Sequence, residues 1–492
     1  ADLEFIEDRK KDLVGIVLTH GHEDHIGAVP YFAKELGVPL YATPFTAKLV
    51  NEKLEEAGNR HEITLNVIDH LDRFELGPFG IRYVPLAHSI AEGNALVIDT
   101  PHGRIFHTGD WKLDDEPLVG VPATVEELTK IGDEGILALV CDSTNVFNPN
   151  ASGSEGAVRT ALLEEVARHP GKRIVVTTFA SNVARLQTLG EVAKASKRKL
   201  CVAGRSLDRI IRAAQGCGYL LDLPERVDFD TAMGLPRGEV LIVATGGQGE
   251  PRAALSRIAE DSHPLALESG DVVLFSSRQI PGNEIAIGRI QNRLAARDIT
   301  IVTDRQSAIH VSGHPGRPEL EALYGWIRPE ILLPVHGEMR HMKEQAQLGK
   351  SCGIAKTVVQ ENGDLVRLAP GKPGKISEVR AGRLILDGDI ISPADGEAIV
   401  MRRRLAANGL VIVVLDGKGR VHVEAIGLPL DEDMDEFVAE SREDVSAALA
   451  KLKGGQRHDR EVITEAARLA ARRAATRWSG KKPQVRVILA EH

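Results

Sequence analysis

Residues 15–25 read GIVLTHGHEDH, and the rest of the chain is best understood outward from this stretch. Its short apolar run is typical of a buried strand, and a polar turn follows that run directly. In a tight turn, the spacing HxHxDH points imidazoles and a carboxylate at one small volume: His20, His22, Asp24 and His25. Neutral imidazole and ionised carboxylate are ligands for zinc, or for manganese where oxygen ligands are more numerous. We therefore predict a metal site here rather than a polar surface loop.

The same arrangement recurs further along the chain, where histidines and aspartates follow apolar, strand-like runs. His88 follows RYVPLA, Asp110 follows RIFHTG, Asp142 follows LALVC and His336 follows EILLPV. A single histidine at a strand end is usually a hydrogen-bonded structural residue, but ligands at successive strand ends converge on one rim of a sheet. Seven candidates are too many for one tetrahedral ion and suit two ions that share a carboxylate. The seven are His20, His22, Asp24, His25, His88, Asp110 and His336.

The composition is that of an ordinary globular protein, with 43% hydrophobic and 27% charged residues in 492 positions. This length predicts roughly three domains. No stretch approaches the roughly 18 apolar residues of a membrane span, and residues 1–15 are too charged for a signal peptide, so we expect a cytoplasmic protein with no membrane partner. Four scattered cysteines indicate reduced thiols. A net charge of -9 still leaves room for a local groove that holds a polyanion.

Three stretches of the chain differ in their secondary-structure pattern. From residue 13 to 141, short β-branched runs predict a large sheet. From about 154 to 304, strands alternate with amphipathic helices, which predicts βαβ units and a mostly parallel sheet. Beyond residue 310 we expect strands again in WIRPEILLPVHGE (326–338), then a linker at LAPGKPGK (368–375) and a small α+β domain.

The HxHxDH stretch, followed by a separate histidine and a bridging aspartate, resembles the signature of the metallo-β-lactamase fold. Further motifs resemble the β-CASP group, the nucleic-acid-processing branch of that fold, and within it the ribonuclease J family. The resemblance covers nearly the whole chain. The motifs are CDSTN (141–145), FASN (179–182), TGGQGEP (245–251), HVSGH (310–314) and PVHGE (334–338).

This resemblance implies an α/β protein: a metallo-β-lactamase αββα sandwich, an inserted β-CASP domain with a parallel sheet, and a small α+β C-terminal domain. The family has a first strand pair and an aspartate-containing turn before the HxHxDH loop, and we expect these N-terminal strands to be missing here. The expected domains are residues 1–154 and 311–390 for the two parts of the metallo-β-lactamase domain, the second with the linker, 155–310 for the β-CASP domain and 391–492 for the C-terminal domain.

The resemblance also implies how the ligands divide between two divalent ions, which we expect to be zinc, with manganese or magnesium as alternatives. His20, His22 and His88 would hold one ion. Asp24, His25 and His336 would hold the other, and Asp110 would bridge the two.

In the family, the FAS segment and the HVSGH loop bind the terminal nucleotide and its phosphate. Phe179 can stack on a base, and hydroxyl, imidazole and amide groups can donate to phosphate oxygens. Without the resemblance, FASN would be a strand-to-helix turn with Ser181 or Asn182 as the helix cap, and TGGQGEP, which lacks a P-loop lysine, would be a glycine-rich turn. The expected substrate-binding residues are Phe179, Ala180, Ser181, His310, Val311, Ser312, Gly313 and His314.

The function implied is a metal-dependent ribonuclease of RNA maturation and decay. We expect in-line attack on phosphorus with loss of the 3′-oxygen, His314 as proton donor, Asp142 as an orienting group, and Asp24 as a third catalytic residue. The partner would be single-stranded RNA with a 5′-monophosphate, degraded from its 5′ end and also cut internally. We expect a homodimer or higher homo-oligomer through the C-terminal domain.

Three other functions remain open. A small-molecule hydrolase of the same fold would share the ligands up to Asp110, but predicts neither the long insert nor HVSGH. A DNA nuclease of the β-CASP group differs only in whether a 2′-hydroxyl is contacted, which the sequence does not show. A non-catalytic RNA-binding subunit would be expected to lack metal ligands, and all of them are present. The basic stretches of the C-terminal domain are interpreted as solvated faces.

Overall fold

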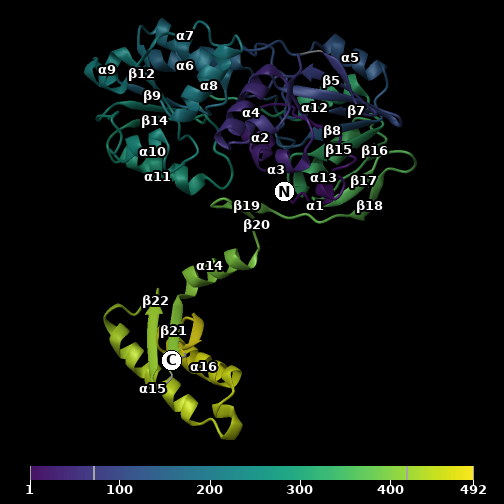
Figure 1. Ribbon diagram of the computed structural model, residues 1–492. Coiled ribbons are helices and arrows are strands. Elements are labelled where there is room, and N and C mark those ends of the chain that lie inside the picture. The colour runs from purple at the N-terminus through teal and green to yellow at the C-terminus, as the bar shows by residue number, and fades with distance from the viewer. Residues whose placement is uncertain (1, 70–71, 417–418, 491–492) are drawn as a thin grey trace. The chain divides into compact units, whose positions relative to one another are not determined.

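The structure is a computed structural model, which describes residues 2–69, 72–416 and 419–490 (Figure 1). The chain divides into two units. One comprises Glu4–Val379, and the other comprises Arg380 onward together with the residues up to Leu3. No helix in the described residues is long and apolar enough to cross a membrane.

The metallo-β-lactamase domain of the first unit contains two sheets that pack against each other. The smaller is parallel, with the order β1-β2-β3. The larger is antiparallel from β4 to β7 and parallel from β7 to β16. The buried Tyr83 hydroxyl joins them, because it donates to the carbonyls of Leu18 (3.0 Å) and Tyr41 (3.1 Å). The smaller sheet comprises β1 (Ile16–Val17), β2 (Leu40–Ala42) and β3 (Leu65–Val67); the larger, in spatial order, comprises β16 (Lys356–Thr357), β15 (Ile331–Val335), β8 (Ala138–Asp142), β7 (Gly103–His107), β6 (Asn94–Thr100), β5 (Phe79–Pro85) and β4 (Arg73–Leu76).

Helices cover the outer faces of these two sheets, which completes the αββα sandwich. Val29 and Ala33 of α3 and Phe45 of α4 pack with the small sheet, while Leu128 of α5 and Leu323 of α12 pack with the large one. These apolar residues recur at helical spacing, so each helix buries one face. The helices of this layer are α3 (Val29–Leu36), α4 (Pro44–Glu56), α5 (Val125–Asp133), α12 (Arg317–Ile327) and α13 (Met339–Ser351), with the short α1 (Glu4–Glu7) and α2 (Glu23–Ile26).

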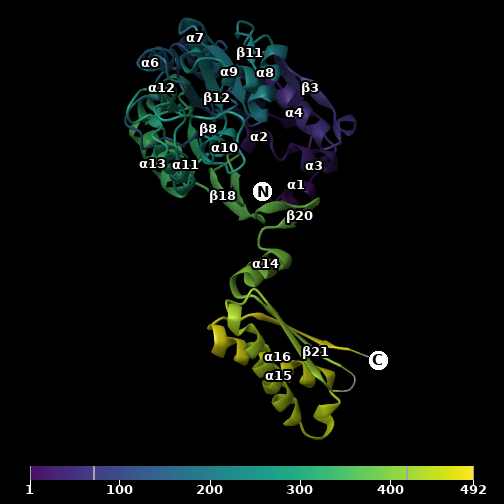
Figure 2. The ribbon, with the colours of Figure 1, turned by 90° about the vertical axis from the view of Figure 1, so that its left-hand side faces the viewer.

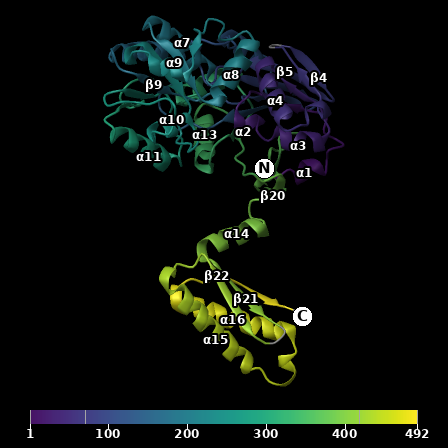
Figure 3. The same ribbon diagram turned by 60° about the vertical axis from the view of Figure 1, so that its left-hand side comes forward.

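The inserted β-CASP domain is an all-parallel sheet with the order β11-β10-β12-β9-β13-β14. The four central strands, β10, β12, β9 and β13, are almost entirely apolar because helices cover both faces. Helices α6, α7 and α8 lie on one face and α9, α10 and α11 on the other, as Figure 3 shows for α7 and α10. The elements are α6 (Glu155–Ala167), β9 (Ile174–Thr177), α7 (Val183–Ala195), β10 (Lys199–Ala203), α8 (Arg205–Gly216), β11 (Arg226–Val227), α9 (Phe229–Gly234), β12 (Val240–Ala244), α10 (Ala254–Ala259), β13 (Val272–Phe275), α11 (Glu284–Ala295) and β14 (Thr300–Val302).

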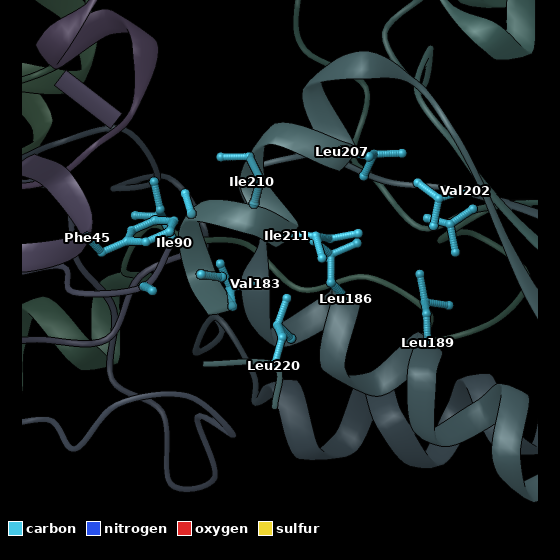
Figure 4. Close-up of a cluster of buried hydrophobic side chains, with 14 of the residues drawn as sticks. Phe45, Ile90, Val183, Leu186, Leu189, Val202, Leu207, Ile210, Ile211 and Leu220 are labelled. Carbon is cyan, nitrogen blue, oxygen red and sulfur yellow. The ribbon is translucent and has the colours of Figure 1, made fainter. Parts of the chain in front are cut away.

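The two domains of the first unit share one apolar core. Phe45 and Ile90 of the metallo-β-lactamase domain belong to the same buried cluster as Val183 and Ile211 of the β-CASP helices (Figure 4). Beside this cluster, Glu92 accepts hydrogen bonds from the Phe45 amide (2.8 Å) and the Tyr219 hydroxyl (3.1 Å). Side-chain packing and these hydrogen bonds therefore hold the β-CASP domain against the metallo-β-lactamase sandwich, in addition to the covalent connections between the two domains.

The second unit is a small α+β domain preceded by a hairpin and a helix. Its three-stranded sheet has the order β22-β21-β23, and α15 and α16 pack on one face of it through Phe437, Val445 and Ala471 (Figure 2). Asp459 caps α16, because its Oδ1 accepts from the amides of Glu461 (2.9 Å) and Val462 (3.3 Å). The elements are β19 (Leu384–Asp387), β20 (Ile390–Pro393), α14 (Glu397–Asn408), β21 (Leu410–Leu415), β22 (Val421–Ile426), α15 (Met434–Ala450), α16 (Arg460–Ser479) and β23 (Gln484–Leu489).

One sequence expectation is wrong, and another is met only in part. The predicted linker, residues 368–375, forms the turn between β17 (Asp364–Arg367) and β18 (Gly374–Glu378), because Gly371 and Gly374 adopt positive φ angles that let the chain fold back. The stretch 326–338 holds a single strand, β15, between the end of α12 and the start of α13. The predicted α/β fold class is confirmed. The predicted domain borders stay predictions.

Candidate metal centre

The seven predicted metal ligands lie at strand ends of the metallo-β-lactamase domain. His20 and His22 follow β1, and Asp24 and His25 lie in α2 directly after them. The other three follow strands of the larger sheet: His88 after β5, Asp110 after β7 and His336 after β15. His336 has a φ of 55°, a left-handed conformation that is rare for a residue other than glycine. Backbone strain of this kind clusters at functional sites.

Asp110 lies at the centre of this group. Its Oδ2 atom is 3.3 Å from His25 Nε2, 3.5 Å from His336 Nε2, 3.8 Å from His88 Nε2 and 3.9 Å from His20 Nε2. Tetrahedral ligands about 2 Å from a zinc ion lie about 3.3 Å from one another. The spacing around Asp110 is therefore close to what a carboxylate shared between two ions requires.

Several of these imidazoles have one nitrogen directed to this group and the other held by a neighbour. His20 Nδ1 lies 3.0 Å from Thr19 Oγ1, and His336 Nδ1 lies 2.9 Å from Thr144 Oγ1. His88 Nδ1 donates to the Gly313 carbonyl at 2.6 Å. Such outer contacts fix the ring orientation and tautomer of metal-binding histidines. Thr19 and Thr144 were not among the site residues predicted from the sequence.

The proton affinities of these histidines differ across the site. Burial, followed by the nearby histidines, holds the pKa of His20 and His88 well below the usual value, and burial lowers the pKa of His22 to about 4. These three rings are therefore neutral, which is the form that ligates a metal. By contrast, hydrogen bonds to Asp142 and Asp24 raise the pKa of His336 to about 11. A divalent cation between these carboxylates would take the place of that proton.

The residues present fit two metal ions. His20 Nε2 is completely buried and has no hydrogen-bond partner among the described residues, although an unpaired buried polar atom is costly. A metal ion at this position would satisfy it. The potential ligand atoms form two groups that share Asp110, each within 4.8 Å: His20, His22, His88 and Asp110, and Asp24, His25, Asp110 and His336. This is the division that the resemblance implies.

The two residues predicted for proton transfer and orientation also lie at the centre. His314 Nδ1 is 2.7 Å from Asp142 Oδ2, and Asp142 Oδ1 accepts from the Thr144 amide at 2.8 Å. Burial alone would lower the pKa of His314, but the Asp142 carboxylate outweighs it and raises that pKa. His314 and Asp142 also form a third potential ligand group with Asp110 and His336.

The HVSGH loop joins the metal centre to the β-CASP domain. Asn145 Nδ2 donates to Ser312 Oγ (2.6 Å) and to the His314 carbonyl (3.2 Å), so the CDSTN segment holds the loop. Val311 packs against the shared apolar core. At the start of the loop, burial and then the nearby Arg185, Arg278 and Lys112 lower the pKa of His310 to about 3. Arg185 and Lys112 are paired with Glu155 and Asp114, so the exposed Arg278 is the cation of these three that can attract an anion to this part of the loop.

The FASN segment contributes to two sites. Ser181 Oγ lies 3.1 Å from His22 Nε2, so this serine touches a predicted metal ligand, a contact that the sequence analysis missed. Asn182 caps α7 by accepting from the Arg185 amide at 2.9 Å, as expected for a strand-to-helix turn. Phe179 and Ala180 line a cavity of about 90 Å³ instead.

That cavity lies at the carboxyl ends of four β-CASP strands, β9, β10, β12 and β13. The TGGQGEP loop forms one wall, and Thr178 and Ser277 lie opposite. The hydroxyls of Thr178 and Ser277 are buried and have no hydrogen-bond partner among the described residues. The connections after β9 and β13 run in opposite directions, and ligands of open α/β sheets bind at such a switch point. The cavity can therefore receive a small polar group.

The structure thus brings all the predicted site residues of the metallo-β-lactamase domain together, and the individual roles predicted for them remain predictions. His107 accepts from the Gly109 amide at 3.0 Å within the turn before Asp110.

Comparison with known protein families assigns most of the chain. Residues 3–130 match the model of the beta-lactamase superfamily domain, and residues 171–294 that of the ribonuclease J beta-CASP domain. Residues 298–360 match the Zn-dependent metallo-hydrolase RNA specificity domain, and residues 397–492 match the ribonuclease J C-terminal domain.

Comparison with curated proteins finds relatives of similar length. Ribonuclease J of Sinorhizobium meliloti is 40% identical over 99% of this chain and 88% of the relative. Ribonuclease J of Mycolicibacterium smegmatis is 36% identical over 98% of this chain and 86% of the relative. Ribonuclease J of Thermus thermophilus is 34% identical over 99% and 87%.

Proposed function

The chain belongs to the ribonuclease J family and is a metal-dependent nuclease, and from this premise we propose that it degrades single-stranded RNA from a 5′-monophosphate end. Release proceeds one nucleotide at a time, and RNA without that end is cut internally by the same site. The observation that carries the proposal is the position of Asp110, whose Oδ2 atom lies among four imidazole nitrogens at 3.3 to 3.9 Å.

Two divalent ions, zinc in the first place, would be held by the two ligand groups that share Asp110. Bound there, they supply an activated water and neutralise negative charge on the phosphate. Asp24 and Asp110 keep the second group anionic, and Thr19, Thr144 and the Gly313 carbonyl keep the histidine rings oriented. The protein's own contribution is alignment.

We assign proton donation to His314. Its Nδ1 is held by Asp142 at 2.7 Å, which leaves Nε2 to give a proton to the departing 3′-oxygen. The raised pKa of His314 keeps that proton in place before the reaction. Asp142 therefore acts as the orienting group.

The substrate would lie between the HVSGH loop and the FAS segment. The loop carries hydroxyl and amide donors near the exposed Arg278, which supports binding of the 5′-phosphate. The cavity lined by Phe179, Thr178 and Ser277 would receive the terminal base. A hydroxyl can donate or accept, so such a cavity would admit each of the four bases in succession.

The decisive experiment uses single-stranded RNA labelled on its 5′-monophosphate, incubated with the protein and zinc or manganese. A labelled mononucleotide as the first product supports the proposal. His22→Ala should abolish its release, and the matched His102→Ala, at an exposed histidine outside the motifs, should not. Labelled oligonucleotides would show internal cutting only, and intact RNA with folded, metal-loaded protein would contradict a ribonuclease. DNA of the same sequence tests the need for a 2′-hydroxyl.

We also propose that copies of the chain associate through the C-terminal domain. Analytical ultracentrifugation of the whole chain tests this, because removal of residues 391–492 should then yield monomers. Persistence of the oligomer would place the contact elsewhere.

A further inference from the structure

A fully buried ion pair lies where the chain enters and leaves the β-CASP domain. Arg185 of α7 is 0% exposed and Glu155, the first residue of α6, is 2% exposed. Arg185 Nε donates to Glu155 Oε2 and Arg185 Nη2 to Glu155 Oε1, each at 3.1 Å. Asn182 Nδ2 also donates to this carboxylate at 3.1 Å. The guanidinium therefore holds the carboxylate with two parallel bonds.

The rest of the guanidinium reaches the segment that leads out of the domain. Arg185 Nη1 donates to the Ile309 carbonyl (3.1 Å) and to the Ser276 carbonyl (3.0 Å). The Ser276 hydroxyl donates to the same Ile309 carbonyl at 2.6 Å. Ile309 directly precedes the HVSGH loop. One buried side chain thus ties the FASN turn, the start of α6, the end of β13 and the start of the loop.

The far end of the loop is attached to the metal centre. The Gly313 carbonyl accepts from His88, Ser312 Oγ accepts from Asn145, and His314 contacts Asp142. The loop therefore spans two anchors, one made by metal-site residues and one made by Arg185. A shift of the second anchor would move the loop relative to the metals without removing any ligand.

Stability alone is a poor explanation for this pair. Burying two charges costs desolvation energy, and their mutual attraction often only offsets this cost. Apolar residues of similar volume commonly stabilise a fold equally well or better. The same helix also buries apolar side chains, with Val183, Leu186 and Leu189 in the shared core (Figure 4). What the ion pair adds is geometry, because a planar guanidinium fixes several acceptors at once.

We propose that Arg185 and Glu155 are positioning residues that set the distance between the 5′-phosphate loop and the metal centre. This rests on the proposed function, in which HVSGH binds the 5′-phosphate. Arg185 is too buried to touch RNA and acts through the Ile309 carbonyl. The pair therefore governs cleavage at a 5′-monophosphate end and has little influence on internal cleavage, which does not need that end.

The test compares Arg185→Lys with the wild type on two RNAs of one sequence, with a 5′-monophosphate and with a 5′-hydroxyl. Lysine keeps the charge but loses the planar fork, so KM for 5′-monophosphate RNA should rise about tenfold while internal cleavage changes by less than about twofold. Ser276→Ala removes one donor to the same Ile309 carbonyl and should shift KM in the same direction by about threefold. If Arg185→Lys does not fold, Ser276→Ala tests the proposal without it.

Arg198→Lys is the matched control. Arg198 is a buried arginine at the opposite end of the same sheet, where it donates to the carbonyls of Lys172, Val240 and His169. It should leave the ratio of the two activities unchanged. The proposal is overturned if Arg185→Lys and Ser276→Ala lower both activities equally. It is also overturned if Arg198→Lys changes the ratio of the two activities as much as these variants do. A wild type that cleaves both RNAs alike would instead contradict the proposed function, and this proposal with it.

Discussion

The carboxyl-end rims of the two large sheets of the first unit are built alike and equipped differently. At the rim of the metallo-β-lactamase sheet, the strands end in imidazoles and carboxylates, each held by a neighbour and most with a shifted pKa. At the rim of the β-CASP sheet, the strands end in hydroxyls and glycines around a cavity. The first rim can bind metal and move protons, whereas the second can only recognise a ligand.

The difference teaches that a strand end supplies a place and the side chain supplies the chemistry. One carboxylate oxygen of Asp110 must lie within reach of four imidazoles, so no other side chain can take its place. Thr178 and Ser277 offer hydroxyls that can donate or accept, so several ligands fit. Changes at the first rim should therefore abolish the reaction, and changes at the second should only weaken binding.

The largest effect is expected for Asp110→Asn. The amide has nearly the same shape but lacks the charge that two cations would share, so activity should fall on the order of a thousandfold or more. Metal content per chain, measured by elemental analysis, should fall with it. The control is Asp115→Asn at an exposed aspartate in the same domain. If the Asp110→Asn variant were active and bound two metal ions, the expected difference in sensitivity between the two rims would be contradicted.

An intermediate effect is expected for Gly247→Ala in the TGGQGEP loop. The added Cβ would lie 2.6 Å from Ser277 Oγ, so it would narrow the cavity. KM for RNA should rise about tenfold, the usual scale of overpacking, while the metal content stays unchanged. Gly288→Ala in α11, where an added Cβ meets nothing within 4 Å, is the matched control. Loss of metal from Gly247→Ala would show that the rims are not independent.

The smallest effect is expected for Thr178→Val, which removes one unpartnered hydroxyl and keeps the shape. KM for RNA should rise by about two- to tenfold, the value of one hydrogen bond, while the melting temperature should hold or increase slightly. Thr188→Val in α7 removes another buried hydroxyl that has no hydrogen-bond partner among the described residues. It should change the melting temperature as Thr178→Val does, but it should leave KM unchanged. Equal KM values for the two variants would exclude the cavity from RNA binding.

Several parts of the fold and the site were predictable because the relevant signal is local. The run before His20 forms β1, and the apolar runs before His88 and Asp110 form β5 and β7. Prediction failed where the pattern is weak or ambiguous. Residues 368–375 have the composition of a linker and form a hairpin turn, since glycine and proline serve both.

The contacts that tune the site could not be predicted. Ser181 was expected to bind phosphate, and the structure places it beside His22, 159 positions away in the sequence. Glu155 and Arg185 carried no signal, because an acidic residue at the start of a helix and an arginine within one are common on exposed surfaces. Only their complete burial marks them.

The sequence by itself determined the class of fold and the family and predicted the candidate metal ligands as a set, because residue type and strand-end position are visible in local patterns. The tertiary structure alone decided which atom of Asp110 faces the four imidazoles, which neighbour fixes each ring, and how Arg185 anchors the HVSGH loop. The reason is physical: these properties depend on distances between segments far apart in the sequence, such as the 85 positions between His25 and Asp110 and the 225 between His88 and Gly313, and only the packing of the folded chain sets them.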